Sequence, residues 1–141
     1  MRTTLIACVV TLGAVFAWPA QPNVSAQASL DYEYFKTKVQ PIFVTKRPGH
    51  ARCISCHGSG TPLRLQPLDA GAATWTEEES RKNFQVIQRV AFAGNARSRL
   101  LLHPLEESAG GDFYHSGGKH WTSQNDPEWL VLKNWVMGQT N

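Results

Sequence analysis

The chain has 141 residues, enough for one domain of ordinary size. Its formal net charge of +3 excludes, on charge alone, a strongly basic nucleic-acid binder and an acidic tail protein. Hydrophobic residues make up 42% of the chain, and five Trp and six Phe favour a packed core over disorder.

The first 28 residues have the features of a secretory signal peptide. Arg2 supplies the positive charge, an apolar stretch runs from residue 5 to 18, and Ala26-Gln27-Ala28 gives a small-x-small cleavage pattern. The apolar stretch is short for a membrane span, which needs about 20 residues. We therefore expect a cleaved signal peptide over 1–28, export to the periplasm or outside the cell, and no stable membrane span in the mature chain. The alternative is a signal kept as an N-terminal anchor.

Helix signals occur throughout the expected mature domain, residues 29–141. Asp31 is placed to cap a helix over 32–43, which Pro41 should kink or end early. Residues 45–62 are rich in Gly and Pro and predict a loop. Thr76 and Glu79 form a capping box, so a second helix should run from there to about Phe92 and end before Gly94.

The C-terminal half predicts two further helical segments around a long loop. Ser98 is placed to cap a short turn through Leu102, and residues 105–125 form a glycine-rich loop. Asp126-Pro127 starts the last helix, which should run until Gly138. Strand signals are weak, so we predict a small all-α domain whose long loops need something to order them.

One motif indicates chemistry. Cys53-Ile54-Ser55-Cys56-His57 is C-x-x-C-H, the attachment signature of a c-type haem. Two thiols at this spacing can reach the two vinyl groups of one porphyrin edge, and the adjacent His57 can bind the iron. Three alternatives stay open: a thioredoxin-type site, which needs a βαβ context that is lacking, a zinc site completed by a distant His, and a disulfide. The export signal, the flanking helices and the glycine-rich loops favour one covalent haem c.

Further patterns accompany the motif along residues 32–138. They are Val39-Gln40-Pro41-Ile42-Phe43, the C-x-x-C-H-G element at 53–58, Leu63-Arg64-Leu65, Ser98-Arg99-Leu100-Leu101 and a closing helix from Glu128 to Val136. With them the chain resembles a monohaem c-type cytochrome, specifically the exported planctomycete-type cytochrome c domain. The resemblance implies a small cytochrome c-like helical domain around one covalent haem and electron transfer with redox protein partners.

The second iron ligand is less well defined, because the Met-Pro-type turn of many such cytochromes is missing. His115 lies between two glycine pairs, where the backbone can approach a flat ring and where the family's Met-containing turn would fall. We therefore predict His57 and His115 as the two ligands. The alternatives are His103, His120 and Met137, while His50 is expected to be solvated. Two imidazoles predict a six-coordinate low-spin iron with a lower reduction potential than a Met/His pair gives.

Other residues have plainer expected roles. Four Trp residues should lie in the core, and Arg64, Arg97 and Arg99 are candidates to pair with the haem propionates. Lys46, Arg47 and Arg52 suggest a weakly basic patch for a redox partner. No catalytic set stands out, so we expect an electron carrier and not an enzyme. Two classes stay open: a haem-based sensor or enzyme with a displaceable sixth ligand, and a structural subunit of a multi-haem homo-oligomer or assembly.

Overall fold

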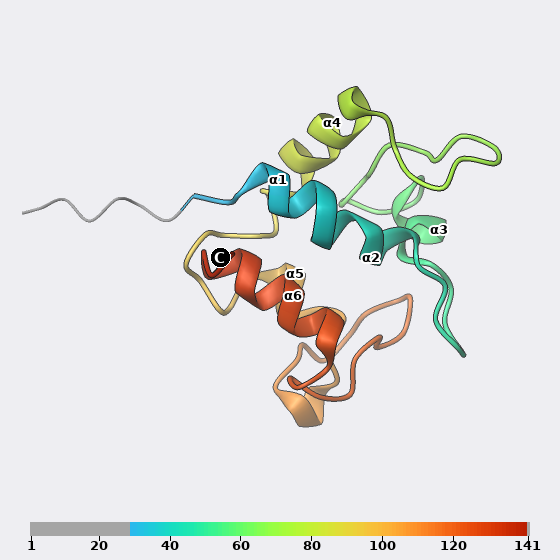
Figure 1. The fold of residues 1–141 in the computed structure, drawn as a ribbon. Coiled ribbons are helices and arrows are strands. Elements are labelled where there is room, and N and C mark those ends of the chain that lie inside the picture. The colour runs from blue at the N-terminus through green and yellow to red at the C-terminus, as the bar shows by residue number, and fades with distance from the viewer. Residues whose placement is uncertain (1–28, 141) are drawn as a thin grey trace, which may run out of the picture.

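The computed structural model describes residues 29–140, and the expected signal peptide over 1–28 lies outside the described residues. Within residues 29–140 the chain forms helices joined by loops, with an isolated bridge between Leu105 and Trp121 and no extended strand (Figure 1). The prediction of an all-α domain is therefore confirmed. In this part of the chain, no helix is both long and apolar enough to span a membrane.

The first helical segment is continuous but changes its winding. It consists of α1 (Tyr32–Tyr34), the π-helical η1 (Phe35–Val39) and α2 (Gln40–Val44). As predicted, Asp31 caps it, accepting a hydrogen bond of 2.7 Å from the Tyr34 amide. Pro41 does not end the helix early. Proline has no N–H and clashes with the carbonyl four residues back, and the wider π turn just before Pro41 accommodates both effects.

The middle of the chain adds one unpredicted helix and shortens a predicted one. α3 (Cys53–His57) lies inside the stretch expected to be a loop. α4 (Glu77–Ile87) begins with the predicted Thr76 capping box but ends five residues before Phe92. The chain leaves the helix because later backbone groups bond elsewhere. The Val90 carbonyl accepts from Leu100, and the Gly94 amide donates to the Val136 carbonyl at 2.7 Å.

The C-terminal part contains α5 (Arg99–Leu102), the 3₁₀ turn η2 (Glu107–Ala109) and α6 (Pro127–Val136). The Asp126 side chain caps α6 as predicted, accepting from the amides of the second and third helical residues. Ser98 precedes α5 but does not cap it with its side chain. Its buried hydroxyl bonds instead to the backbone of Phe92 and Asn95, which closes the turn between α4 and α5.

The core forms where α6 packs beside the first helical segment (Figure 1). The prediction that four Trp residues are core residues is confirmed: Trp75, Trp121, Trp129 and Trp135 are at most 5% exposed. Each indole N–H also finds an acceptor, as buried Trp side chains usually do. The tryptophans therefore fix the positions of α6 and the neighbouring loops, which form one wall of the site described next.

Candidate functional site

A single cleft brings the C-x-x-C-H motif together with the distant histidines. It encloses about 1110 Å³ of space free of protein atoms, its open mouth included. Cys53, Cys56 and His57 line one side, and His103, His115 and His120 line the other. Apolar side chains complete the walls: Ile42, Phe43, Val90, Leu100 and Leu132. The cleft is thus a mainly apolar slot with imidazoles and thiols at its surface.

Helix α3 presents the three motif side chains to the cleft. Residues three and four apart share one face of a helix, so Cys53, Cys56 and His57 can all line the same space. The helix ends at Gly58, whose amide donates to the Ile54 carbonyl at 2.8 Å. A Cβ at Gly58 would lie 2.9 Å from that oxygen, so a glycine is needed there. Both cysteines are free thiols, so the structure does not contain the alternative disulfide.

His57 is oriented by hydrogen bonds on one side of its ring. Its Nδ1 lies 2.9 Å from the Leu63 carbonyl oxygen and 2.9 Å from the Thr61 hydroxyl. The carbonyl can only accept, so this network assigns the hydrogen to Nδ1. Nε2 then carries a free lone pair, the arrangement found in metal-binding histidines. Burial also lowers the pKa of His57, which favours the neutral ring that binds metals.

His115 lies opposite His57. The two ring centres are 6.2 Å apart, and the ring planes differ by only 17°. The Nδ1 of His115 is 2.6 Å from the Gly118 carbonyl oxygen, which likewise assigns its hydrogen and leaves Nε2 free. Gly118 has a φ of 78°, a left-handed conformation that glycine adopts without strain.

The separation of these two rings suits a shared metal ion. A bond from an imidazole nitrogen to a first-row metal is about 2 Å long. Two rings that each contribute one such bond can have centres about 6 Å apart, as those of His57 and His115 are. Together with the two thiols and the apolar walls, this donor set fits a flat iron-containing cofactor attached through Cys53 and Cys56.

The alternative iron ligands differ in their position and in their hydrogen-bond partners. The ring centres of His103 and His120 are 4.9 and 5.9 Å from that of His115. The Nδ1 of His103 lies 3.2 Å from the Asp112 carboxylate, and its Nε2 lies 3.5 Å from a guanidinium nitrogen of Arg99. Burial lowers the pKa of His120 to about 4, and its Nδ1 is buried without a partner. Met137 follows α6 and does not line the cleft.

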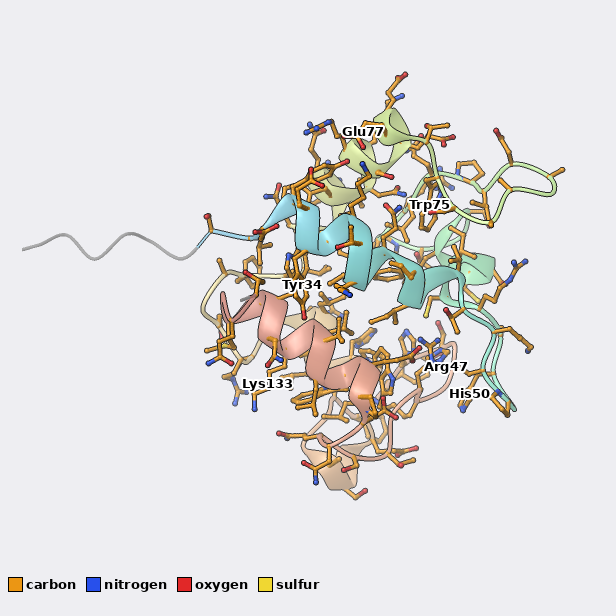
Figure 2. The ribbon with its side chains drawn as sticks, in the orientation of Figure 1. Tyr34, Arg47, His50, Trp75, Glu77 and Lys133 are labelled. Carbon is orange, nitrogen blue, oxygen red and sulfur yellow. The ribbon has the colours of Figure 1, made fainter. Side chains whose placement is uncertain are left out.

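His50 differs from the expectation. The basic turn around it predicts a solvated side chain, whereas it is half-buried and its ring centre lies 4.9 Å from that of His120. Figure 2 shows it near Arg47, in the segment that precedes α3. The expectation was wrong because the loop after His115 folds back over the basic turn, a tertiary contact with no local signal.

Lys119 holds the loop that carries the histidines, a role that sequence reasoning did not identify. Its ammonium group donates to the carbonyls of His103, at 3.1 Å, and Asp112. The loop also needs Gly111, because a Cβ there would lie 1.9 Å from the Leu105 carbonyl oxygen. Only glycine permits this close approach of two backbone segments.

The arginine candidates separate by position. Arg99 lines the cleft, so it stays a candidate partner for an acidic group of a ligand. Arg64 donates to the Ser59 carbonyl at 2.9 Å, and neither it nor Arg97 lines the cleft. Arg52, expected in a patch for a redox partner, does line it.

Among residues 29–140, no group of three or more His, Cys, Asp or Glu side chains is placed to hold a metal ion by itself. The zinc alternative requires four ligands and so has no such cluster to support it in this part of the chain. Comparisons with protein-family models, curated proteins and solved structures found no match. The resemblance to a monohaem cytochrome therefore stays a prediction based on the residues themselves.

Proposed function

We propose that this chain is an exported c-type cytochrome with one covalent haem, which carries electrons between redox proteins and is not an enzyme. Cys53 and Cys56 would attach the porphyrin, and His57 and His115 would bind the iron. The fold would then be a cytochrome c-like arrangement, with α3 carrying the attachment motif and α6 packing beside the first helical segment.

One observation carries the proposal: the His57 and His115 rings face one cleft with centres 6.2 Å apart. Both rings direct Nδ1 to a backbone carbonyl, which leaves both Nε2 lone pairs for a metal. The attachment cysteines line the same cleft. Two ligands of this kind suffice for a haem, because the porphyrin supplies the other four nitrogens.

The haem would supply an iron that cycles between the ferric and ferrous states. The chain contributes the environment of that iron. Leu63 and Thr61 orient His57, and Gly118 orients His115. Apolar side chains such as Phe43, Leu100 and Leu132 would surround the bound group and keep water from it, which would lower the local dielectric constant.

The direct test is expression of the full chain in a host with working cytochrome maturation machinery. We expect a coloured protein whose mass exceeds that of the processed polypeptide by one haem that resists acid–acetone extraction. Its ferric spectrum at neutral pH should be low-spin. A folded, colourless protein would contradict the proposal, and a high-spin ferric spectrum would contradict the ligand assignment.

A haem-based sensor is the second candidate, and the position of His115 favours considering it. The neighbours of His115 on this loop are exposed: Phe113 by 84% and Tyr114 by 64%. A ligand on such a surface loop can be displaced more easily than one on a buried helix. Binding of carbon monoxide to the reduced protein distinguishes the two functions, because fast binding requires an open or easily displaced ligand position.

A further inference from the structure

Arg47 is largely shielded from solvent beside the attachment motif. Its side chain is only 11% exposed, although the basic turn around it predicts a solvated residue. One guanidinium nitrogen, Nη1, lies 3.7 Å from the Cys53 sulfur, and Nη2 donates to the Ile42 carbonyl at 3.0 Å. Arg47 does not line the cleft, whereas Cys53 does, so the guanidinium reaches the sulfur from the protein side.

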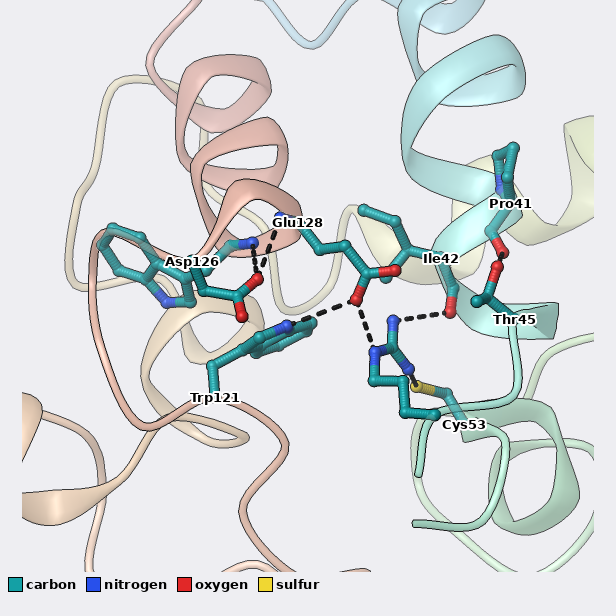
Figure 3. Close-up of polar contacts among 9 residues, drawn as sticks. Pro41, Ile42, Thr45, Cys53, Trp121, Asp126 and Glu128 are labelled. Carbon is teal, nitrogen blue, oxygen red and sulfur yellow. Dashed lines mark hydrogen bonds and ion pairs between the residues drawn. The ribbon is translucent and has the colours of Figure 1, made fainter. Parts of the chain in front are cut away.

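Glu128 fixes the orientation of this guanidinium. Its carboxylate, in the first turn of α6, accepts from Nε of Arg47 and from the Trp121 indole N–H at 3.4 Å (Figure 3). The guanidinium also lies over the Trp121 ring, 5.4 Å from its centre. The planar fork of arginine is thus held by three separate parts of the chain: the end of α2, the start of α6 and the loop before α6.

The Arg47–Glu128 ion pair need not stabilise the fold. The free energy needed to remove the two charges from water can equal the free energy gained from their attraction. The sulfur contact gives a more specific reason for the arrangement. Burial raises the pKa of the Cys53 thiol above its ordinary value, and the charge and hydrogen bond of Arg47 act in the opposite direction. Cys56, in contrast, is exposed to solvent.

We propose that Arg47 is a positioning residue for haem attachment at Cys53: held by Glu128, it orients the sulfur toward the cleft and stabilises negative charge on it. The inference rests on the proposed function. It adds that haem attachment at the two cysteines depends differently on Arg47. Attachment at half-buried Cys53 depends on Arg47, whereas attachment at exposed Cys56 does not.

The step itself needs no oxidant or reductant. The thiol adds across one vinyl group of the porphyrin. The S–H bond breaks, a bond forms between sulfur and the vinyl carbon next to the ring, and the hydrogen ends on the terminal vinyl carbon. One C=C double bond becomes a single bond. The thiolate is the nucleophilic form of cysteine, so a cation that stabilises it in a half-buried site favours the addition.

The test counts free thiols at each cysteine. The full chain and its Arg47→Gln variant are matured in the same host, treated with iodoacetamide under denaturing conditions, and digested for mass spectrometry. We expect the fraction of haem-bearing chains with alkylated Cys53 to rise about tenfold in Arg47→Gln, because the variant loses a charge-assisted hydrogen bond. Alkylation of Cys56 should stay at the wild-type level. A chain that keeps one vinyl group should also show its reduced absorption maximum at longer wavelength.

Two controls separate positioning from general damage. Arg97→Gln removes an exposed arginine outside the cleft and should leave both attachments complete. Trp135→Phe destabilises the core without changing Arg47 or Glu128, and it should also leave them complete. Arg47→Lys keeps the charge without the planar fork, so its fraction of free Cys53 should be intermediate. If Arg47→Gln yields no folded protein, Arg47→Lys decides by the same measurement.

The outcomes are distinguishable. Complete attachment at Cys53 in the deciding arginine variant would overturn the inference and leave the proposed function intact. Equal loss at Cys53 in Trp135→Phe would overturn it too, because general instability would then explain the effect. A wild-type chain that carries no haem would instead contradict the proposed function.

Discussion

The indole nitrogen of Trp135, on helix α6, donates a hydrogen bond of 2.7 Å to the backbone carbonyl of Asp31, the residue that caps α1. Trp135 is fully buried, and its ring centre lies 5.5 Å from that of Phe35 and 6.2 Å from that of Phe84. One side chain therefore joins the last helix to the first helical segment and to α4. Aromatic clusters of this kind contribute strongly to core stability.

Replacing Trp135 should consequently destabilise the whole fold. Trp135→Phe loses the hydrogen bond and part of the ring, and should lower the free energy of unfolding by about 1–3 kcal/mol. Trp135→Ala should lower it by about 3–5 kcal/mol, since it leaves a large cavity. Urea unfolding followed by circular dichroism measures both values. Phe92→Leu, at a side chain that is 51% exposed, is the matched control and should change the free energy of unfolding little. A Trp135→Phe protein as stable as wild type would contradict the proposed contribution of Trp135 to the core.

Local signals predicted the helix starts better than the helix ends. Asp31, Thr76 and Asp126 all cap as expected, because a cap depends on side chains within three residues of the helix start. The end of α4 was misplaced because a tertiary bond, from the Gly94 amide to the Val136 carbonyl, competes with further helical turns. The continuation of the first segment past Pro41 depends on a π turn that no residue pattern indicated.

The residues of the cleft show the same difference between local signals and long-range contacts. The spacing of Cys53, Cys56 and His57 predicted that these side chains share one space, and they do line one cleft. The glycines around His115 singled out a histidine that lies opposite His57. Arg47 is expected in a basic patch for a redox partner and Lys119 has no expected role, because their actual contacts join segments that are far apart in sequence. Long-range contacts of this kind have no periodic or spacing signal.

His115→Ala should remove one of the two proposed iron ligands and leave His57 in place. We expect the ferric protein to change from a low-spin to a high-spin spectrum at neutral pH, with loss of nearly all the low-spin signal. His103→Ala and His120→Ala, at the two neighbouring rings, should keep the low-spin spectrum. Absorption and electron paramagnetic resonance spectra measure the change. An unchanged low-spin spectrum in His115→Ala would move the assignment to His103 or His120.

Glu77 should give the protein a pH-dependent part of its stability. This residue on α4 is labelled in Figure 2. It lies 2.5 Å from Lys36, accepts a hydrogen bond of 3.0 Å from Tyr32 and pairs with Arg81. The hydrogen bond with Lys36 lowers the pKa of Glu77 below its ordinary value of 4.5 in the folded protein. The native state therefore favours the ionised carboxylate, which stabilises the fold above the ordinary pKa and ceases to do so as the pH falls through the lowered value.

Glu77→Gln should thus reduce stability slightly at about pH 7, and the difference from wild type should shrink toward about pH 3. The effect is small because the pair is exposed, and added salt should reduce it further. Urea unfolding midpoints across this pH range measure it. Glu107→Gln, at an exposed acid on η2, should show no comparable pH dependence. If the difference in unfolding midpoint between Glu77→Gln and wild type is the same at both pH values, Glu77 does not supply the pH-dependent part of the stability.

If His115 binds the iron as proposed, Lys119 should control how readily it detaches. Its ammonium group ties the loop to the carbonyls of His103 and Asp112, so Lys119→Met should loosen the loop without touching the proposed ligands. Losing about 1.4 kcal/mol of loop stabilisation would raise the population with His115 detached about tenfold. The rate of carbon monoxide binding to the reduced protein should rise by the same factor, since the gas binds only an open position. Stopped-flow mixing measures this rate, with exposed Lys38→Met as the control.

The rate at which the reduced wild-type protein binds carbon monoxide distinguishes an electron carrier from a sensor. A carrier with two tightly bound imidazoles should bind carbon monoxide very slowly, whereas His115→Ala should bind it at once. Lys119→Met should lie between these limits, because its iron is open for only a fraction of the time. Fast binding by the wild-type protein would favour the sensor function. A Lys119→Met rate equal to that of wild type, with fast binding in His115→Ala, would show that Lys119 does not retain His115 on the iron.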